Sequence, residues 1–276
     1  MTLSTLLRLE GRDAIALLHR IGTQKLDDLA PGGARATLFC DFRGRLLHRA
    51  VAGVTRDGAV WLLRDDAPGA ELAAFLDRHV FRDDVRIVDH SARFAVQPAP
   101  PGAGGPALEE DGGVPRAALT NHDVLVVRDV ADARPVDPGE RVRAARPAHG
   151  HEIVAAFTPF EVGLAHDVHL DKGCFTGQEA LMRLVTYRSV RRRLARIGGD
   201  GAPPPAPTDL RDSRAGAEGP GAVGVLTSAV ADSARWIGLA VVRNDALEPP
   251  RPLTIAGGAA TDPPEPLPET RALGRP

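Results

Sequence analysis

Cysteine is scarce in this chain, which has two cysteines in 276 residues. Two thiols so far apart in the sequence do not make a disulfide framework, so we expect the reducing cytoplasm, with a Cys40–Cys174 bond as the open alternative. Long apolar runs are lacking too, because none approaches the ~18 residues that a membrane-spanning helix needs. The first residues also lack the charged leader and apolar block of a signal peptide. These absences predict a cytoplasmic protein with no membrane partner.

The chain also lacks a large excess of charge of either sign. The chain carries 34 basic and 36 acidic residues, for a formal net charge of -2, and only 4% of its residues are aromatic. No global field therefore draws it toward nucleic acid or an anionic membrane. Five arginines do fall within the nine residues 188–196, but no aromatic residue is interleaved with them. This run predicts an edge strand over residues 190–197 with solvated arginines, and an anionic ligand or a protein partner is the alternative.

The length of the chain is ample for two or three compact units. Its composition, 43% hydrophobic and 25% charged, is that of a globular protein. Stretches rich in glycine and proline predict a linker over residues 97–115 and a long loop over residues 198–222. The proline-rich end after Asp262 is predicted to be frayed.

Apolar periodicity predicts a few helices among many strands. One helix is predicted over residues 11–29 with Asp13 as its cap, and another begins at Pro68. The predicted strands are residues 36–40, 46–54, 59–63, 84–88, 124–127, 223–229, 236–243 and 253–256. This mixture favours the α+β fold class.

One stretch, residues 171–184, surrounds the second cysteine with the groups that a reactive thiol needs. Only a thiolate is a good nucleophile, and a nearby cation or helix N-terminus lowers the pKa of a thiol. Lys172 supplies the cation for Cys174. Thr176 and Glu179 form a capping box, which predicts a helix N-terminus at Thr176. The alternative is a cysteine that is buried and inert.

Two further features bear on ligand binding. Gly173 and Gly177 beside the thiol leave room for a sharp turn and for close approach of a ligand. Elsewhere, His149 and His151 flank a glycine, a spacing that suggests a metal site. A zinc site needs about four ligands, however, and nothing near these histidines completes the set. We therefore expect no metal site.

Residues 172–179 read K-G-C-F-T-G-Q-E. They resemble the signature K-G-C-[YF]-x-G-Q-E of the YgfZ-type folate-binding proteins, which are relatives of the glycine-cleavage aminomethyltransferase and are linked to maintenance and repair of iron–sulfur enzymes. Other segments resemble the same superfamily, in the same order along the chain. They are residues 18–32, 42–46, 141–152, 158–164 and 224–243. Within 141–152, Ala145 stands where the family pattern has a glycine.

The resemblance covers most of residues 6–256 and implies an α+β fold of three modules around a central channel. Two interleaved α+β folate-binding modules are expected to occupy residues 1–185. A small C-terminal β-barrel is expected over residues 186–260, carrying the loop 198–222. Residues 261–276 form the frayed tail.

The resemblance further implies that tetrahydrofolate or a derivative lies in the central pocket. Cys174 and Lys172 are then the candidate catalytic pair at its rim, where the thiol either coordinates or protects a cluster iron or takes part in thiol exchange. The candidate folate-binding residues are Glu161, Gly173, Gln178, Glu179, Glu71 and Arg188. For Glu161 the alternative role is compensation of a helix dipole. The expected partners are folate and iron–sulfur client proteins, without nucleic acid, and the expected state is a monomer.

Two other functions stay open, so the sequence does not decide whether the chain is an enzyme. A folate-dependent one-carbon transferase or cyclase would use Glu71, which falls near the position of the aspartate in the aminomethyltransferases. Their Asn-Ala stretch corresponds here to residues 62–67, L-L-R-D-D-A, and their R-x-G-Y-T-G-E stretch has no counterpart around residues 119–128. Glycine-cleavage chemistry is therefore not expected. The third hypothesis is a non-catalytic interaction module, with neither folate binding nor a reactive thiol.

Overall fold

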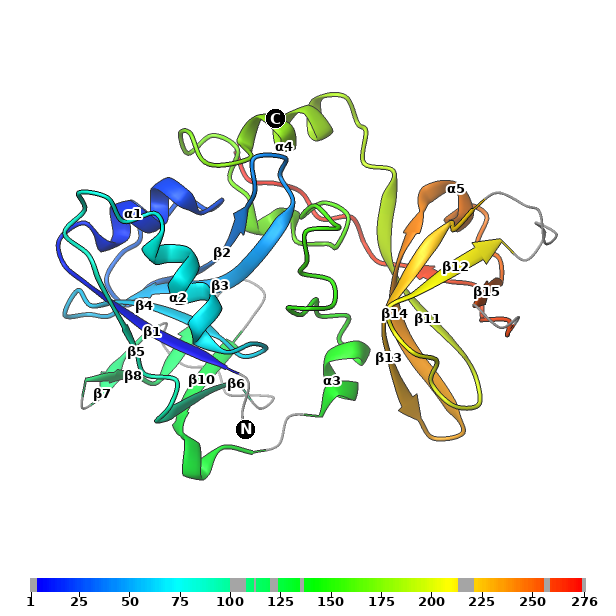
Figure 1. Ribbon diagram of the computed structural model, residues 1–276, viewed down its shortest axis with the longest axis horizontal. Helices are drawn as coiled ribbons and strands as arrows, with labels where there is room; N and C mark the ends of the chain where they lie inside the picture. The colour runs from blue at the N-terminus through cyan, green and yellow to red at the C-terminus, as the bar shows by residue number, and fades with distance from the viewer. Residues whose placement is uncertain are drawn as a thin grey trace. The chain divides into compact units, whose positions relative to one another are not determined.

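The computed structural model describes residues 4–99, 108–111, 113–119, 124–134, 137–212, 221–255 and 259–274. Contacts divide the chain into two compact units (Figure 1). Unit 1 comprises Met1–Pro135, Asp167–Ala180 and Ala272–Pro276, and unit 2 comprises Val136–His166 and Leu181–Arg271. The chain therefore passes from one unit to the other at four points, after residues 135, 166, 180 and 271. This division differs from the predicted boundary at 185/186, because residues 136–166 belong with the C-terminal strands.

Unit 1 is built on a five-stranded antiparallel sheet with the strand order β2-β3-β4-β1-β5. The strands are β1 (Thr5–Glu10), β2 (Ala34–Cys40), β3 (Leu46–Val54), β4 (Val60–Arg64) and β5 (Arg86–Asp89). Their apolar side chains alternate between two cores, so that Leu6 lies in one and Leu7 in the other. The helices α1 (Ala14–Ile21) and α2 (Gly69–Asp77) pack into the same core as Leu7 and therefore cover that face of the sheet.

The other face of this sheet packs against a second, three-stranded sheet with the order β6-β10-β9. Its strands are β6 (Phe94–Pro98), β10 (Val124–Asp129) and β9 (Ala117–Leu119). Val96 and Val127 of this sheet share a core with Trp61 and Leu63 of β4. Two short strands, β7 (Glu110–Asp111) and β8 (Val114–Pro115), pair with each other, and a 3-10 turn (Val130–Asp132) follows β10. Unit 1 therefore has three layers, with helices on one side of the central sheet and strands on the other.

Several predicted elements of unit 1 differ in extent. Helix α1 is shorter than the predicted 11–29, because the chain turns to an extended conformation at Gly22. The carboxylate of Asp13 makes no capping hydrogen bond to the helix and instead accepts one from the backbone of Asp84, at 2.8 Å. Within the predicted linker 97–115, residues 97–98 belong to β6 and residues 110–115 hold β7 and β8, while residues 100–107 and 112 lie outside the described residues.

Unit 2 is built on a six-stranded antiparallel sheet with the order β15-β12-β13-β14-β11-β16. The strands are β11 (Arg192–Asp200), β12 (Thr208–Asp212), β13 (Gly224–Asp232), β14 (Arg235–Arg243), β15 (Leu253–Ile255) and β16 (Glu265–Pro266). Its helices are α3 (Pro138–Arg143) and α5 (Asn244–Leu247), and a 3-10 turn spans Ala165–Asp167. Helix α4 (Gln178–Thr186) carries the chain from unit 1 into unit 2 and begins two residues after the predicted Thr176. Leu226, Trp236 and Leu253 lie in the core of this unit.

Two segments of unit 2 are more regular than the sequence predicts. Within the predicted loop 198–222, residues 208–212 form β12 between β13 and β15, and residues 213–220 lie outside the described residues. The tail after Asp262 is not frayed where it is described. Its residues 265–266 pair with β11, and Leu273 exchanges backbone hydrogen bonds with Val168 and Leu170 at 2.7 and 2.8 Å. The proline-rich composition does not predict these contacts, because backbone pairing depends little on side-chain type.

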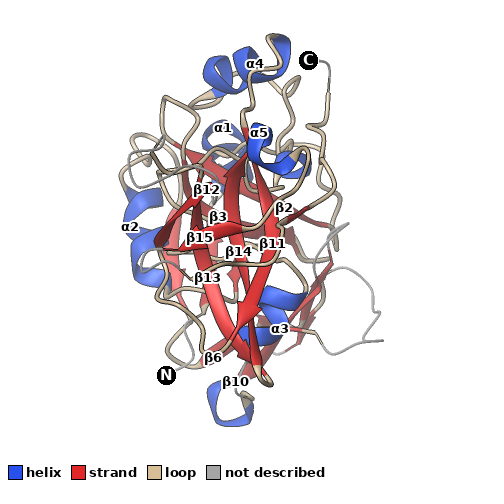
Figure 2. Cartoon of the chain, turned by 90° about the vertical axis from the view of Figure 1, so that its right-hand side faces the viewer, coloured by secondary structure: helices blue, strands red, loops and turns tan. Residues whose placement is uncertain are grey.

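Strands and loops make up most of both units, and the helices are few and short (Figure 2). This agrees with the predicted mixture of sheets with a few helices. Among the described residues, no helix has the length and apolar character needed to cross a bilayer.

Helix α3 ends at a position that favours glycine. Ala145 follows the helix with φ +52°, while its N–H bonds to Val142 and the N–H of Arg146 bonds to Arg141, which is the Schellman pattern. Alanine in this left-handed conformation costs about 1 kcal/mol relative to glycine. The left-handed backbone conformation therefore explains why the family pattern has a glycine at this position.

We expect Ala145→Gly to raise the free energy of unfolding of unit 2 by about 1 kcal/mol, because glycine relieves that strain. Ala144→Gly is the matched control, because Ala144 has right-handed helical geometry and gains nothing from glycine. Urea unfolding in a Trp61→Phe background, followed by the fluorescence of Trp236 in the core of unit 2, measures both variants. Equal effects of the two substitutions would contradict the strain at Ala145.

Candidate functional site

The two thiols of the chain have opposite environments. Cys174 is exposed in the loop of residues 171–177, here called the thiol loop, which precedes α4 in unit 1. Cys40 is buried at the end of β2, where burial, assisted by the charge of Asp41, raises the pKa of its thiol well above the usual range. Both cysteines are free, so the Cys40–Cys174 bond that the sequence left open is not formed. The structure therefore leaves Cys174 as the accessible thiol.

The first anchor of the thiol loop is Lys172, which is buried. Its ammonium donates a hydrogen bond to the carbonyl oxygen of His19 on α1 and lies 5.1 Å from the centre of the Phe175 ring. Burial lowers the pKa of the Lys172 ammonium to about 8, and the carboxylate of Asp27 opposes that shift. The contacts of this ammonium, within the described part of the chain, are thus with His19 and Phe175. Its predicted role as the cation beside Cys174 stays a prediction.

The second anchor is Gly177, which lies against the turn between β2 and β3. Gly177 has φ +86°, and a Cβ atom added to it would lie 2.5 Å from the carbonyl oxygen of Asp41 and 3.0 Å from Cα of Gly44. The turn itself is fixed, because the carboxylate of Asp41 accepts hydrogen bonds from the N–H groups of Arg43 and Arg45, both at 2.8 Å. Glycine is therefore the residue that allows the thiol loop to approach this turn.

The third anchor joins the two ends of the loop. The side-chain amide of Gln178 donates to the carbonyl oxygen of Leu170 at 2.9 Å, and Leu170 in turn bonds to Leu273 of the tail. Gln178, a predicted folate-binding residue, therefore has a structural role in closing the loop. Gly173 has φ +102° with no neighbouring atom within 4 Å of an added Cβ, so the backbone turn beside Cys174 is open on that side.

Glu161 lies in unit 2, where it is buried. One carboxylate oxygen accepts a hydrogen bond from the backbone N–H of Thr158 at 2.9 Å, and the other accepts from Nε of Arg192 at 2.7 Å. Arg192 also lies over the ring of Phe157, at 5.4 Å from its centre. This carboxylate thus closes its own turn and pairs with β11, so its contacts explain its presence without a ligand.

The arginine run is paired rather than simply solvated. Besides Arg192, Arg193 forms ion pairs with Glu248 and Glu269, and Arg196 donates to the carbonyl oxygen of Arg143 at 3.2 Å. The expectation of solvated arginines was wrong for Arg192 and Arg193, because carboxylates from distant segments reach them. Much of the positive charge of the run is therefore balanced within unit 2.

The other predicted folate-binding residues are exposed. Glu179 lies in the first turn of α4, and Arg188 follows the same helix in unit 2 with φ +48°. Glu71 lies in the first turn of α2, and its charge partly offsets the lowering of the pKa of buried Arg64, which burial causes. Local sequence thus brings Cys174 close to Lys172, Gly173, Gln178 and Glu179, whereas Glu161 and Arg188 belong to unit 2.

Comparison with known proteins places this geometry on a familiar fold. The crystal structure of the glycine cleavage system aminomethyltransferase T from Bartonella henselae matches with a TM-score of 0.73, over 99% of this chain and 86% of that one, at 16% sequence identity. The chain has the aminomethyltransferase fold. At this identity the likeness establishes the fold alone.

The sequence comparisons are more limited. No family model matches the chain. It is 34% identical over 88 residues to a chloroplastic protein of Arabidopsis thaliana that is named as a candidate transferase. That match covers 32% of this chain and 19% of the relative, so it spans about a fifth of the relative's length. The aminomethyltransferase fold therefore rests on the structural match, and it agrees with the superfamily resemblance of the sequence.

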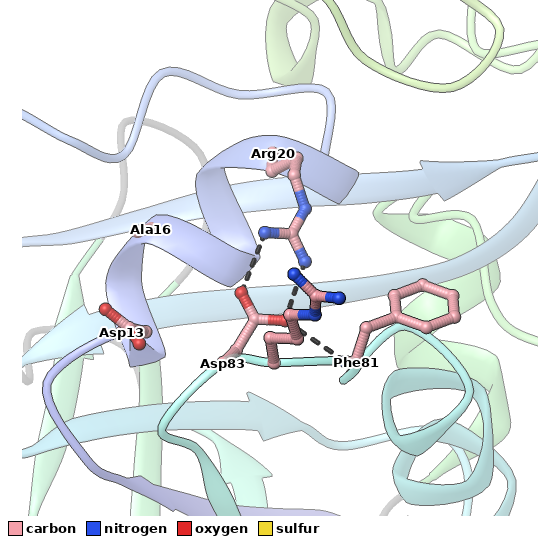
Figure 3. A pocket seen from close by; sticks show the side chains of 6 residues that line it. Asp13, Ala16, Arg20, Phe81 and Asp83 are labelled. Atoms are coloured by element: carbon pink, nitrogen blue, oxygen red, sulfur yellow. Dashed lines mark hydrogen bonds and ion pairs between the residues drawn. The ribbon is translucent and has the colours of Figure 1, made fainter.

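The aminomethyltransferase fold of this chain also carries a surface pocket of about 500 Å³ in unit 1 (Figure 3). It is lined by Asp13, Ala16, Arg20, Phe81, Arg82 and Asp83. Two guanidinium nitrogens of Arg20 bond to the two carboxylate oxygens of Asp83, at 2.8 and 3.0 Å, and this pairing lowers the pKa of Asp83 to about 2. The pocket contains none of the predicted site residues, and the central charges in it neutralise each other.

Sequence reasoning missed two parts of the site. His19 was part of a family-like segment, but nothing in the sequence linked it to Lys172, 153 residues away. The segment Asp41–Gly44 lies between two predicted strands, but its contact with Gly177 depends on the folded backbone. Two glycines, at 44 and 177, were the available signals that two backbones approach each other closely.

We expect one of the two thiols to react in the folded protein. A disulfide reagent should modify Cys174 within minutes of mixing, because this thiol is exposed. The same reagent should leave Cys40 unmodified until the protein is unfolded. Cys174→Ser should remove the native reactivity, whereas Cys40→Ser should leave it unchanged. Two reactive thiols under native conditions would contradict the burial of Cys40.

Proposed function

We propose that this protein binds tetrahydrofolate or a reduced derivative and supports iron–sulfur enzymes through the thiol of Cys174. The observation that carries the proposal is an exposed free thiol on a loop with three anchors, within the aminomethyltransferase fold. An exposed thiol whose backbone is held in place suits a reaction with a partner, because its position does not have to be fixed during binding. The K-G-C-F-T-G-Q-E segment supplies that loop and resembles the YgfZ-type signature.

The finer arrangement belongs to the same proposal. We infer three modules around a central channel, with the folate in the channel and Cys174 at its rim. The aminomethyltransferase fold supports this, because it is shared with a protein of the glycine cleavage system. The exposed carboxylates Glu71 and Glu179 are the predicted folate contacts that keep an accessible side chain in unit 1. Glu161 and Gln178 would act indirectly, because hydrogen bonds within the protein already engage their side chains.

Two kinds of thiol chemistry fit this site. In thiol exchange, the Cys174 thiolate attacks one sulfur of a partner disulfide, a new S–S bond forms, and the other partner sulfur leaves as a thiolate, so no external oxidant is needed. In the second kind, the thiol binds or protects an iron of a client cluster. A mixed disulfide trapped on Cys174 would identify the first, and iron bound in proportion to Cys174 would identify the second. The client is expected to bind a cytoplasmic monomer.

The test combines ligand binding with the thiol. Isothermal titration calorimetry with tetrahydrofolate should give saturable binding to the wild-type protein and to Cys174→Ala. The same variant should fail to restore iron–sulfur enzyme activity in cells that lack the protein, while Cys40→Ala restores it. Absence of folate binding would refute the folate half of the proposal, and full restoration by Cys174→Ala would refute the thiol half.

A folate-dependent one-carbon transferase is the second candidate. The observations that favour it are the aminomethyltransferase fold, the transferase name of the plant relative, and the exposed carboxylate of Glu71 near the start of α2. This function predicts turnover of a small amine or acid in the presence of folate, and loss of that turnover in Glu71→Gln. Folate binding without turnover would leave the first proposal as the better account.

A further inference from the structure

One residue outside the predicted site, His19, contacts the thiol loop with both its side chain and its backbone. The imidazole Nε2 of His19 lies 3.1 Å from the carbonyl oxygen of Lys172, and the carbonyl oxygen of His19 accepts a hydrogen bond from the Lys172 ammonium. Two residues 153 positions apart are therefore joined by two hydrogen bonds that run in opposite directions. Paired contacts of this kind fix the orientation of the loop as well as its distance from α1.

The other imidazole nitrogen determines which atom carries the proton. Nδ1 of His19 accepts hydrogen bonds from the backbone N–H groups of Leu26 and Asp27, at 3.1 and 3.3 Å, and the Asp27 carboxylate lies 3.5 Å from it. A nitrogen that accepts from N–H groups has a free lone pair, so the proton of the neutral ring is on Nε2. Nε2 is therefore the donor to Lys172, and His19 links the segment after α1 to the thiol loop.

We infer that His19 is the positioning residue of the thiol loop, which it holds through Lys172 so that Cys174 is presented at a fixed place on the surface. This role rests on the proposed function in so far as that function uses the thiol. Gly173 has no neighbour within 4 Å of an added Cβ, so the backbone beside Cys174 is held by Lys172 on one side and by buried Phe175 and Gly177 on the other. Removal of the His19 imidazole leaves the Lys172 side held by the ammonium alone.

Two conservative substitutions separate the two functions of the imidazole ring. In His19→Gln the amide nitrogen takes the place of Nε2 and keeps a donor for the Lys172 carbonyl. In His19→Asn the amide oxygen takes the place of Nδ1 and keeps the acceptor for Leu26 and Asp27, but the side chain is too short to reach the loop. A positioning role therefore predicts that glutamine preserves the loop and asparagine does not.

The mobility of a nitroxide spin label on Cys174 measures how firmly the thiol loop is held. The label reports Cys174 alone, because Cys40 is buried and does not take it. We expect the label in His19→Asn to be clearly more mobile than in the wild type and in His19→Gln. Amide hydrogen exchange of residues 171–178 should be faster in His19→Asn by about tenfold, the factor that corresponds to one net hydrogen bond. Thermal unfolding of each variant confirms that the comparison is made on folded protein.

Three results would contradict a positioning role for His19. Wild-type loop mobility in His19→Asn would show that the loop does not depend on His19. Equal mobility in His19→Gln and His19→Asn would show that the ring merely fills space. Should His19→Asn fail to fold, His19→Leu removes both imidazole nitrogens at a similar side-chain volume, and an unchanged label in that variant would refute the role. The measurements need no folate, so they are decided separately from calorimetry on the wild-type protein.

Discussion

Replacement of Glu152 by alanine is expected to lower the free energy of unfolding of unit 2 by about 3–5 kcal/mol, the usual loss when one partner of a buried ion pair is removed. Glu152 is fully buried. One of its oxygens accepts hydrogen bonds from Arg141 at 2.9 Å and from the backbone of Ala148 at 3.1 Å. The other accepts from the hydroxyl groups of Thr227 and Ser228 on β13. A single carboxylate therefore joins three segments of unit 2.

The size of the effect follows from what the substitution leaves behind. Without the carboxylate, the guanidinium of Arg141, whose side chain is 12% exposed, remains nearly buried without its counter-charge. Its second contact, from Nη2 to Ser228 at 2.7 Å, does not supply a negative charge. Unpaired buried donors add to the loss. Glu152→Gln keeps the shape but not the charge, so we expect an intermediate loss.

The two tryptophans of the chain make this experiment specific. Trp61 lies in unit 1 and Trp236 in unit 2, so in a Trp61→Phe background the fluorescence reports unit 2 alone. Glu140→Ala is the matched control, because Glu140 is an exposed glutamate on α3 and its loss should change stability by less than about 0.5 kcal/mol. Free energies of unfolding in urea for Glu152→Ala and Glu140→Ala that differ by less than about 1 kcal/mol would refute the network.

This network also explains a family pattern that the sequence could only match by resemblance. Arg141 and Glu152 are the first and last residues of the segment 141–152, and the structure joins them directly. Their spacing is therefore set by the loop that returns the chain from α3 to its own start. The sequence matched this segment to the family pattern, but it did not show that the Glu152 carboxylate would meet Ser228 of β13, because that contact spans 76 residues.

Elements that depend on local sequence are predictable from it, whereas elements that depend on pairing between distant segments are not. The strands at 36–40 and 46–54 follow from short apolar runs separated by a turn, and the structure places β2 and β3 there. By contrast, β12 lies within a stretch that composition marked as a loop, because its pairing with β13 and β15 provides what its sequence does not. Strand β1 was also missed. Its central position in the sheet comes from partners on β4 and β5, far along the chain.

The candidate site shows the same division. The thiol stretch was recognisable because the cysteine, glycines and glutamine are close together in sequence, and the structure shows that Cys174 is exposed. The side-chain partners were not predictable in the same way. Glu161 bonds to Arg192, 31 residues away, and Lys172 bonds to His19, 153 residues away. Composition and periodicity carry no information on which of many charged residues will meet across such distances.

The second large effect is expected at Gly177. Gly177→Ala should destabilise unit 1 by about 2–4 kcal/mol, combining the strain of a left-handed alanine with overpacking against a rigid neighbour. The added Cβ would lie 2.5 Å from the carbonyl oxygen of Asp41 and 3.1 Å from the N–H nitrogen of Gly44. Both are backbone atoms of a turn that the Asp41 carboxylate holds with two hydrogen bonds. The turn cannot move aside without losing those bonds, so the thiol loop must detach.

Gly173→Ala is the matched control for this prediction, because it separates strain from collision. Gly173 also has a positive φ, +102°, but an added Cβ meets no atom within 4 Å, so only the strain of about 1–2 kcal/mol is expected. Urea unfolding followed by Trp61 in a Trp236→Phe background measures both variants in unit 1. A loss in Gly177→Ala no larger than in Gly173→Ala would mean that the loop does not rest on the turn. In that case the exposure of Cys174 would depend on its sequence neighbours alone, and the second anchor of the thiol loop would have to be abandoned.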